Sequence, residues 1–161
     1  MSNKNKAIIC DIDGCLVNTD RIFKEILQRD LTGDEKWDYF HRFANEPSHS
    51  LKNRRLIQYL IDMSYKGYEI LLVTARSEEI YKETFKYLYN NSNYVFDFKL
   101  YCRKINDYRP SWVVKEDITK DLLKDYDVIM AIDDELANCQ MFESLGLLTF
   151  RYRINYAELS Q

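Results

Sequence analysis

The feature that most constrains the fold is an alternation of short apolar runs with segments of helical spacing. Five runs are typical of β-strands, at residues 6–12, 68–74, 96–102, 127–132 and 147–152. Between them, four segments place apolar residues three or four positions apart, at residues 53–66, 78–89, 116–124 and 135–145. Strands that alternate with helices predict an α/β protein with a mostly parallel, five-stranded sheet covered by helices on both faces.

The length of the chain and its low content of turn-forming residues indicate a single domain that comprises residues 1–161. A chain of 161 residues fits a single domain, and only four glycines, two prolines and no internal repeat interrupt it. Residues 19–52, which follow the first strand, are too few for a large cap domain and too many for a turn. We expect them to form a small helical insert of one or two helices above the sheet.

Composition limits the classes of partner. The net charge of −3 argues against a broad, sequence-blind nucleic-acid binder, but it allows a small site that grips one phosphate. The four cysteines form no C-x-x-C pair and no zinc-binding spacing. The N-terminal residues do not resemble a signal peptide, and no apolar run approaches the ~20 residues that span a bilayer. We therefore expect a cytoplasmic protein with reduced thiols and no membrane partner.

Charged and hydroxyl side chains follow the predicted strands. The residues in question are Asp11, Asp13, Thr74, Arg76, Asp133 and Asp134, with Lys115 just before the predicted helix at 116. Taken singly, a D-x-D pair is usually a solvated turn, a D-D pair is often a helix N-cap, and a lone lysine is usually on the surface. Their joint occurrence predicts one shared site, because the carboxyl ends of parallel strands meet at one edge of the sheet.

The charges of this site indicate its chemistry. Two carboxylates 4 Å apart repel by about 4 kcal/mol at an effective dielectric constant of 20, so four of them need a cation. All-oxygen ligands favour magnesium over zinc. A magnesium ion beside a lysine and a hydroxyl is suited to phosphoryl transfer. One carboxylate can attack phosphorus to give an aspartyl-phosphate, while a second serves as acid for the leaving oxygen and base for water.

In order and spacing, the stretches DIDG, LLVTAR, VVKEDI and AIDDE resemble the four motifs of the haloacid dehalogenase superfamily. The resemblance implies a Rossmann-like, three-layer fold with Asp11 as the nucleophile and Asp13 as the general acid and base. It also implies that Thr74 and Lys115 hold the transferring phosphoryl group. Magnesium would be bound by Asp11, the backbone carbonyl of Asp13, and Asp133 or Asp134.

Two longer stretches, DYRPSWVVKEDI and YDVIMAIDDELANCQMFESLGLLTF, are similar to the 3′-phosphatase domain of phage-type polynucleotide kinase-phosphatases. In that group the arginine of the second motif contacts the substrate phosphate, which here implies Arg76. Another arginine lies about ten residues past the nucleophile, and Arg21 is the nearest match. We place Arg76, Arg21 and Gly14 among the substrate-binding residues.

The sequence departs from this group at several positions. Cys15 stands where threonine is common, a change that concerns packing. Ser111 and Trp112 stand where acidic residues are usual, and this loosens the surroundings of Lys115. Glu135 replaces the arginine after the aspartate pair and removes one cation from the rim, which bears on the substrate more than on the chemistry.

We therefore predict a magnesium-dependent phosphomonoesterase that removes 3′-phosphates from nucleic-acid ends. A 5′- or 3′-nucleotidase, or another small-molecule phosphatase, would use the same residues, so the partner is a phosphorylated nucleic-acid end or a nucleotide. A binding protein on a degenerate phosphatase fold is disfavoured because the motif residues are intact. No G-x-x-x-x-G-K-[ST] motif occurs, so no kinase activity is expected. The sequence does not specify the oligomeric state.

The predicted insert is rich in aromatic residues. Trp37, Tyr39, Phe40 and Phe43 can either stack on nucleic-acid bases, at about 1–3 kcal/mol each, or pack the insert onto the body. Packing is the default interpretation, and the sequence leaves both open. His41 lies eight residues before His49 with no cysteine nearby, so a metal role is not expected for either.

Overall fold

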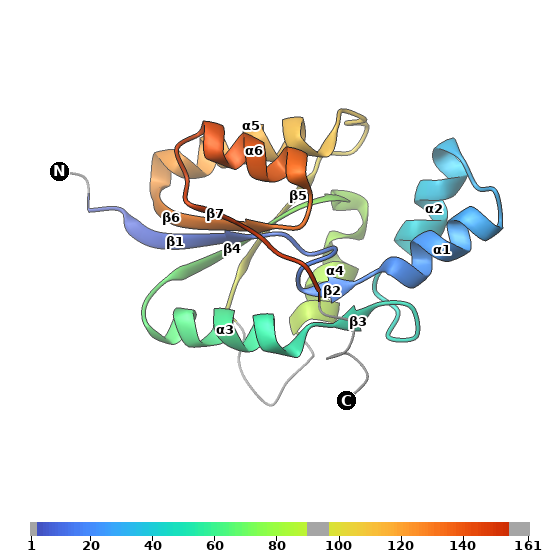
Figure 1. The fold of residues 1–161 in the computed structure, drawn as a ribbon, viewed down its shortest axis with the longest axis horizontal. Helices are drawn as coiled ribbons and strands as arrows, with labels where there is room; N and C mark the ends of the chain where they lie inside the picture. The colour runs from blue at the N-terminus through green and yellow to red at the C-terminus, as the bar shows by residue number, and fades with distance from the viewer. Residues whose placement is uncertain (1–2, 90–96, 155–161) are drawn as a thin grey trace.

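A parallel sheet forms the centre of the computed structural model, which describes residues 3–89 and 97–154 (Figure 1). Its strands are β1 (Asn5–Cys10), β4 (Glu69–Ser77), β5 (Lys99–Arg103), β6 (Tyr126–Asp133) and β7 (Thr149–Arg151). They lie in the order β5-β4-β1-β6-β7, and every neighbouring pair is parallel. The predicted five-stranded parallel sheet is confirmed.

Helices cover both faces of the sheet. Helix α3 (Arg54–Tyr65) and helix α4 (Tyr81–Tyr89), which follows the short 3-10 helix η1 (Glu78–Ile80), lie on one face; α5 (Ser111–Asp125) and α6 (Leu136–Ser144) lie on the other (Figure 1). The predicted three-layer, Rossmann-like architecture is confirmed. The connections leave β1 toward β4 on one side and β6 on the other, so the strand order reverses at β1. In such sheets ligands bind outside the carboxyl ends of the strands at this position.

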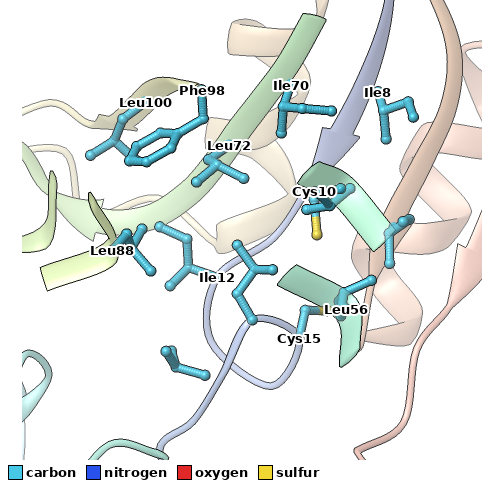
Figure 2. Close-up of a cluster of buried hydrophobic side chains, with 14 of the residues drawn as sticks. Ile8, Cys10, Ile12, Cys15, Leu56, Ile70, Leu72, Leu88, Phe98 and Leu100 are labelled. Atoms are coloured by element: carbon cyan, nitrogen blue, oxygen red, sulfur yellow. The ribbon is translucent and has the colours of Figure 1, made fainter. Parts of the chain in front are cut away.

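The alternation of side chains along β1 builds two cores. Ile8 and Cys10 face α3 and α4, as Figure 2 shows, whereas Ala7 and Ile9 face α5 and α6. All four are fully buried, and burial of an isoleucine side chain stabilises the fold by about 1.5–3 kcal/mol. Asp11 continues the second series, so its carboxylate points to the side of the sheet that α5 covers.

Residues 19–50 leave the body through a two-stranded ribbon. Strand β2 (Val17–Asn18) pairs antiparallel with β3 (Leu51–Lys52), and between them lie α1 (Asp20–Gln28) and α2 (Gly33–Phe43). In Figure 1 this helix pair, which we call the insert, projects beyond the carboxyl end of the sheet. It has its own small core of Ile22, Ile26, Phe40 and Ala44. The ribbon was not predicted, because two-residue strands leave no periodic signal.

Two element boundaries correct the expectations. Helix α5 begins at Ser111, directly after Pro110, so Lys115 lies inside a helix and not before one. A proline is well tolerated at the start of a helix, where its missing N–H costs nothing. Strand β4 runs on to Ser77, so Thr74 and Arg76 lie within the strand.

The other predicted segments fall within a few residues of the observed elements. The predicted strand 96–102 corresponds to β5, and residue 96 lies outside the described residues. No helix within residues 3–89 and 97–154 combines the length and the apolar character needed to cross a membrane.

Candidate active site

A fully buried lysine joins two of the predicted carboxylates. The Nζ atom of Lys115 lies 2.8 Å from Oδ1 of Asp11 and 2.6 Å from Oδ2 of Asp133. Lys115 is 1% exposed, because α5 packs against the sheet and directs this side chain inward. A buried charge is stable only when it is paired, so the three side chains form one electrostatic unit.

The second oxygen of Asp133 is held by the start of α6. Its Oδ1 accepts hydrogen bonds from the backbone N–H of Glu135, at 3.0 Å, and from Nδ2 of Asn138, also at 3.0 Å. With Lys115 on the other oxygen, the carboxylate has donors on both sides and a fixed orientation. Sequence reasoning missed Asn138, although its place one turn into the helix after the aspartate pair is a usable signal.

Asp134 lies against the turn that follows β1. A Cβ atom placed on Gly14 would come within 2.1 Å of Oδ2 of Asp134, and Gly14 has a φ of +80°. Both observations require glycine at this position, since other residues have a Cβ and rarely adopt positive φ. Gly14 thus allows the first motif to contact the last, and its predicted role in substrate binding stays a prediction.

Burial and neighbouring carboxylates both raise pKa values in the site. Burial raises the pKa of Asp11; Lys115 opposes this rise, but Asp133, Asp13 and Asp134 add to it. Burial, followed by repulsion from Asp133, raises the pKa of Asp134 to about 6. One lysine therefore does not neutralise the group, and an additional cation would be attracted to it.

The donor atoms fit a divalent cation. Ligand atoms of Asp11, Cys15 and Asp134 lie within 4.8 Å of one another, and Asp133 shares Lys115 with Asp11. The carboxylate oxygens suit magnesium, whereas the Cys15 sulfur is a soft ligand that magnesium does not prefer. The carboxylate oxygens of Asp11 and Asp134 are therefore close enough together to make a magnesium site chemically consistent.

The buried Arg76 and the partly exposed Asp13 form a second ion pair. The guanidinium holds the carboxylate with two parallel hydrogen bonds, Nε to Oδ2 at 2.9 Å and Nη2 to Oδ1 at 2.7 Å. Its other N–H groups donate to Oδ1 of Asn45, Oγ1 of Thr84 and the carbonyl of Ala44. Arginine has five N–H donors, so all of them are occupied. Arg76 orients Asp13 and ties it to the end of the insert.

Thr74 and Arg21, the two remaining predicted residues, differ in location. Thr74 is fully buried beside β1, and its hydroxyl accepts a hydrogen bond from the backbone N–H of Arg76 at 3.1 Å. The Arg21 side chain is 60% exposed, pairs with Glu25 at 3.0 Å and donates to the carbonyl of Ser48. The structure brings Thr74 to the rim, but it does not bring Arg21 to the carboxylates.

Sequence reasoning also missed the partners of Arg76. Asn45 follows α2 and Thr84 lies in α4, so both come from segments outside the four motifs. Neither has a sequence signal, because a single polar residue among helical segments is ordinary. Asn45 and Thr84 meet Arg76 only because β4, α4 and the insert lie close together in the fold.

The sequence matches one protein family over residues 5–155, the phosphatase domain of polynucleotide kinase PNKP. The chain belongs to this family. The PNKP-type phosphatase domain accounts for nearly the whole described chain, and the predicted membership in the haloacid dehalogenase superfamily is confirmed. The protein is accordingly a phosphatase. No curated protein matches its sequence.

Solved structures share the fold. Two structures of the Pnkp1/Rnl/Hen1 complex, one titled as an RNA repair complex, superpose with a TM-score of 0.72 and 24% identity; each covers 97% of this chain. A haloacid dehalogenase family enzyme from Bacteroides thetaiotaomicron, in complex with magnesium and inorganic phosphate, superposes with a TM-score of 0.62 and 15% identity. The match covers 98% of this chain and 99% of that enzyme. The class C acid phosphatase from Bacillus anthracis superposes with a TM-score of 0.62 and 17% identity, and the match covers 85% of this chain and 54% of that chain. The PNKP-type domain spans 48% and 44% of the two chains in the repair complexes, about half their length.

Proposed function

We propose that this domain is a magnesium-dependent phosphomonoesterase that removes 3′-phosphates from nucleic-acid ends through an aspartyl-phosphate on Asp11. The buried Lys115, shared by Asp11 and Asp133, is the observation that carries the proposal. It supplies the positive charge that lets a carboxylate approach an anionic phosphate in a site otherwise dominated by negative groups.

In the first half-reaction, a carboxylate oxygen of Asp11 attacks phosphorus and the bond between phosphorus and the sugar oxygen breaks. Asp13 donates a proton to that leaving oxygen. In the second, Asp13 takes a proton from a water molecule that attacks the same phosphorus, which releases inorganic phosphate and regenerates Asp11. Both oxygens of Asp13 are bonded to Arg76, so proton transfer requires at least one of these hydrogen bonds to open.

Lys115 and Thr74 are proposed to hold the transferring phosphoryl group. A magnesium ion held by Asp11, the Asp13 carbonyl, and Asp133 or Asp134 would offset the mutual repulsion of these carboxylates, which adds to the effect of burial in raising the pKa values of Asp11 and Asp134. The magnesium and phosphate in the Bacteroides thetaiotaomicron enzyme support this choice of ion.

The family match supports the proposed substrate class. The match is to a phosphatase domain of polynucleotide kinase, and two of the similar structures are complexes that contain Pnkp1. A small-molecule phosphatase is the second candidate, because the class C acid phosphatase shares the fold and Glu135 places a negative charge where the polynucleotide-specific group has an arginine.

One substrate panel separates the two candidates. We expect kcat/KM for a 3′-phosphorylated oligonucleotide to exceed that for nucleoside 3′- and 5′-monophosphates, and phosphate release to stop when EDTA removes the metal. The Asp11→Asn protein, purified in parallel, reports any contaminating phosphatase. Preference for the monomers would overturn the nucleic-acid assignment, and no release from any substrate would overturn the phosphatase mechanism.

A further inference from the structure

The structure sorts the four aromatic residues of the insert. Phe40 is 4% exposed and lies in the insert core, and the Tyr39 hydroxyl donates to Glu25 at 2.7 Å. The partly buried Phe43 packs against Tyr39 with 4.6 Å between ring centroids. Trp37 is different, because it is 48% exposed. Of the four rings that the sequence offered for stacking, Trp37 is the one available at the surface.

Trp37 belongs to an aromatic patch that reaches the catalytic rim. The patch consists of Trp37, Phe23 and Phe40. The Trp37 ring lies edge-on to Phe40 at 6.1 Å, and the Phe23 ring, which is also partly exposed, lies 5.3 Å from Phe40. On the inner side, the guanidinium carbon of Arg76 lies 5.8 Å from the Phe40 centroid. The patch therefore extends outward from the residue that holds Asp13.

Hydrogen bonds fix this patch relative to the reacting groups. The residues that directly follow α2, Ala44 and Asn45, accept hydrogen bonds from Arg76, and Arg76 in turn holds Asp13. Because Trp37 lies on the helix that Ala44 and Asn45 follow, its distance from Asp13 is set by a short chain of hydrogen bonds. A strand whose terminal phosphate reached Asp11 would pass the patch at a defined position.

We propose that Trp37, with Phe23 beside it, is a stacking platform for a base upstream of the phosphorylated terminal nucleotide. The inference rests on the proposed function and identifies where the polynucleotide strand leaves the site. Every base has a π-face, so such a platform binds strands without regard to sequence. The Lys36 ammonium lies over one face of the Trp37 ring, 4.8 Å from its centroid, so a base would stack on the opposite face, and the ammonium adds a positive charge that attracts the phosphates of the strand.

Kinetics on two substrates tests the proposal. We expect Trp37→Ala to lower kcat/KM for a 3′-phosphorylated oligonucleotide by about 5- to 100-fold, the loss of one stacked base. The loss should lie mainly in KM, because stacking is equal in the ground and transition states. For a nucleoside 3′-monophosphate, which has no upstream base, kcat/KM should change by less than about twofold.

Two variants control this measurement. Trp37→Phe keeps a stacking ring and should retain most of the activity, which separates stacking from general damage to the insert. Tyr65→Ala removes an aromatic side chain that is 74% exposed at the end of α3, near the amino ends of the strands, and should leave both substrates unaffected.

The outcomes separate this inference from the proposed function. If the unaltered protein cleaves the oligonucleotide and Trp37→Ala does so equally well, or loses activity equally on both substrates, the platform is overturned and the proposed function stands. If the unaltered protein cleaves monomers but not the oligonucleotide, the nucleic-acid assignment itself fails and the platform fails with it.

Fluorescence gives a readout that is independent of turnover. The chain has two tryptophans, so Trp112→Phe leaves Trp37 as the only indole emitter. In the Asp11→Asn background, a 3′-phosphorylated oligonucleotide should quench this emission, whereas inorganic phosphate should not. The reciprocal Trp37→Phe protein, which reports from Trp112 on α5, should show no quenching by either. Equal quenching from both reporters, or from neither, would overturn the platform.

Discussion

The rim of the sheet and the insert use the same kind of ion pair in opposite surroundings. At the rim, the side chains of Lys115, Asp11 and Asp133 are 2%, 7% and 1% exposed. In the insert, Arg21 pairs with Glu25 at a similar distance, but the Arg21 side chain is 60% exposed. Water screens the insert pair and leaves it weak. At the rim, removal of one partner leaves the other as an unpaired charge in an apolar environment, which is costly. Burial, more than distance, therefore decides how strongly an ion pair affects the stability of the protein.

The largest expected effect is on catalysis at the rim. Asp11→Asn removes the nucleophilic carboxylate and keeps its shape, so phosphate release should fall by about 10⁴-fold or more while the fold persists. Steady-state phosphate release measures the first effect, and circular dichroism with thermal unfolding checks the second. Turnover near that of the unaltered protein would place the nucleophile on another residue.

The next effect is on stability. Lys115→Met should lower the free energy of unfolding by about 3–5 kcal/mol, because Asp11 and Asp133 lose their shared cation in a buried site. Urea unfolding without added metal measures the change. Lys120→Met is the matched control, since Lys120 lies on the same helix in an exposed pair with Glu116 and should have little effect. Equal losses for both variants would contradict the difference in stabilisation between buried and exposed ion pairs.

A smaller effect concerns the pH dependence of stability. Folding raises the pKa of Asp134 from 3.8 to about 6, so the folded protein binds this proton more tightly than the unfolded chain. The stabilising contribution is complete below pH 3.8 and is lost as the pH rises through about 6. In EDTA, the unfolding free energy should therefore decline over this range more steeply than in Asp134→Asn.

Magnesium should reverse that decline. Because the metal binds ionised carboxylates, the rise in Tm on its addition should grow as the pH increases through about 6. Thermal melts at several pH values, with and without the metal, measure both trends. If the unaltered protein and Asp134→Asn had parallel pH profiles of stability, Asp134 would not be the group that titrates over this range.

The smallest effect is expected in the insert. Arg21→Ala should change kcat/KM by less than about threefold, because the exposed Arg21 contacts only Glu25 and the Ser48 carbonyl among the described residues. The phosphate contact implied by resemblance predicts a larger loss. A reduction of tenfold or more on both substrates would show that Arg21 moves to the phosphate when substrate binds.

The fold was largely predictable because the strands carry a strong periodic signal. The apolar runs around Ile9 and Leu71 are long, and each continues into polar residues at the same edge of the sheet. The β2–β3 ribbon was not predictable, since two-residue strands are defined by their partner and not by a pattern. The start of α5 was also misplaced, and with it the setting of Lys115.

The carboxylates of the site were predictable, but their supports were not. Asp11 and Asp133 stand out because charge at the end of a buried strand is costly unless it is used. Asn45 and Asn138, which hold Arg76 and Asp133, are single polar residues in helical surroundings. The role of Asn45 comes from contact with a distant segment, which a linear pattern does not encode, whereas Asn138 lies only five residues after Asp133 and was overlooked.

The pairing of β1 with β6 has a consequence for how the protein is made. During translation Asp11 is made before Lys115 and Asp133, which follow more than a hundred residues later. A chain that stops before β6 thus contains Asp11 and Lys115 but lacks Asp133, so the three-residue charge unit forms only after β6 has been synthesised. The order of the strands along the chain therefore delays assembly of the acidic site until β6 pairs with β1.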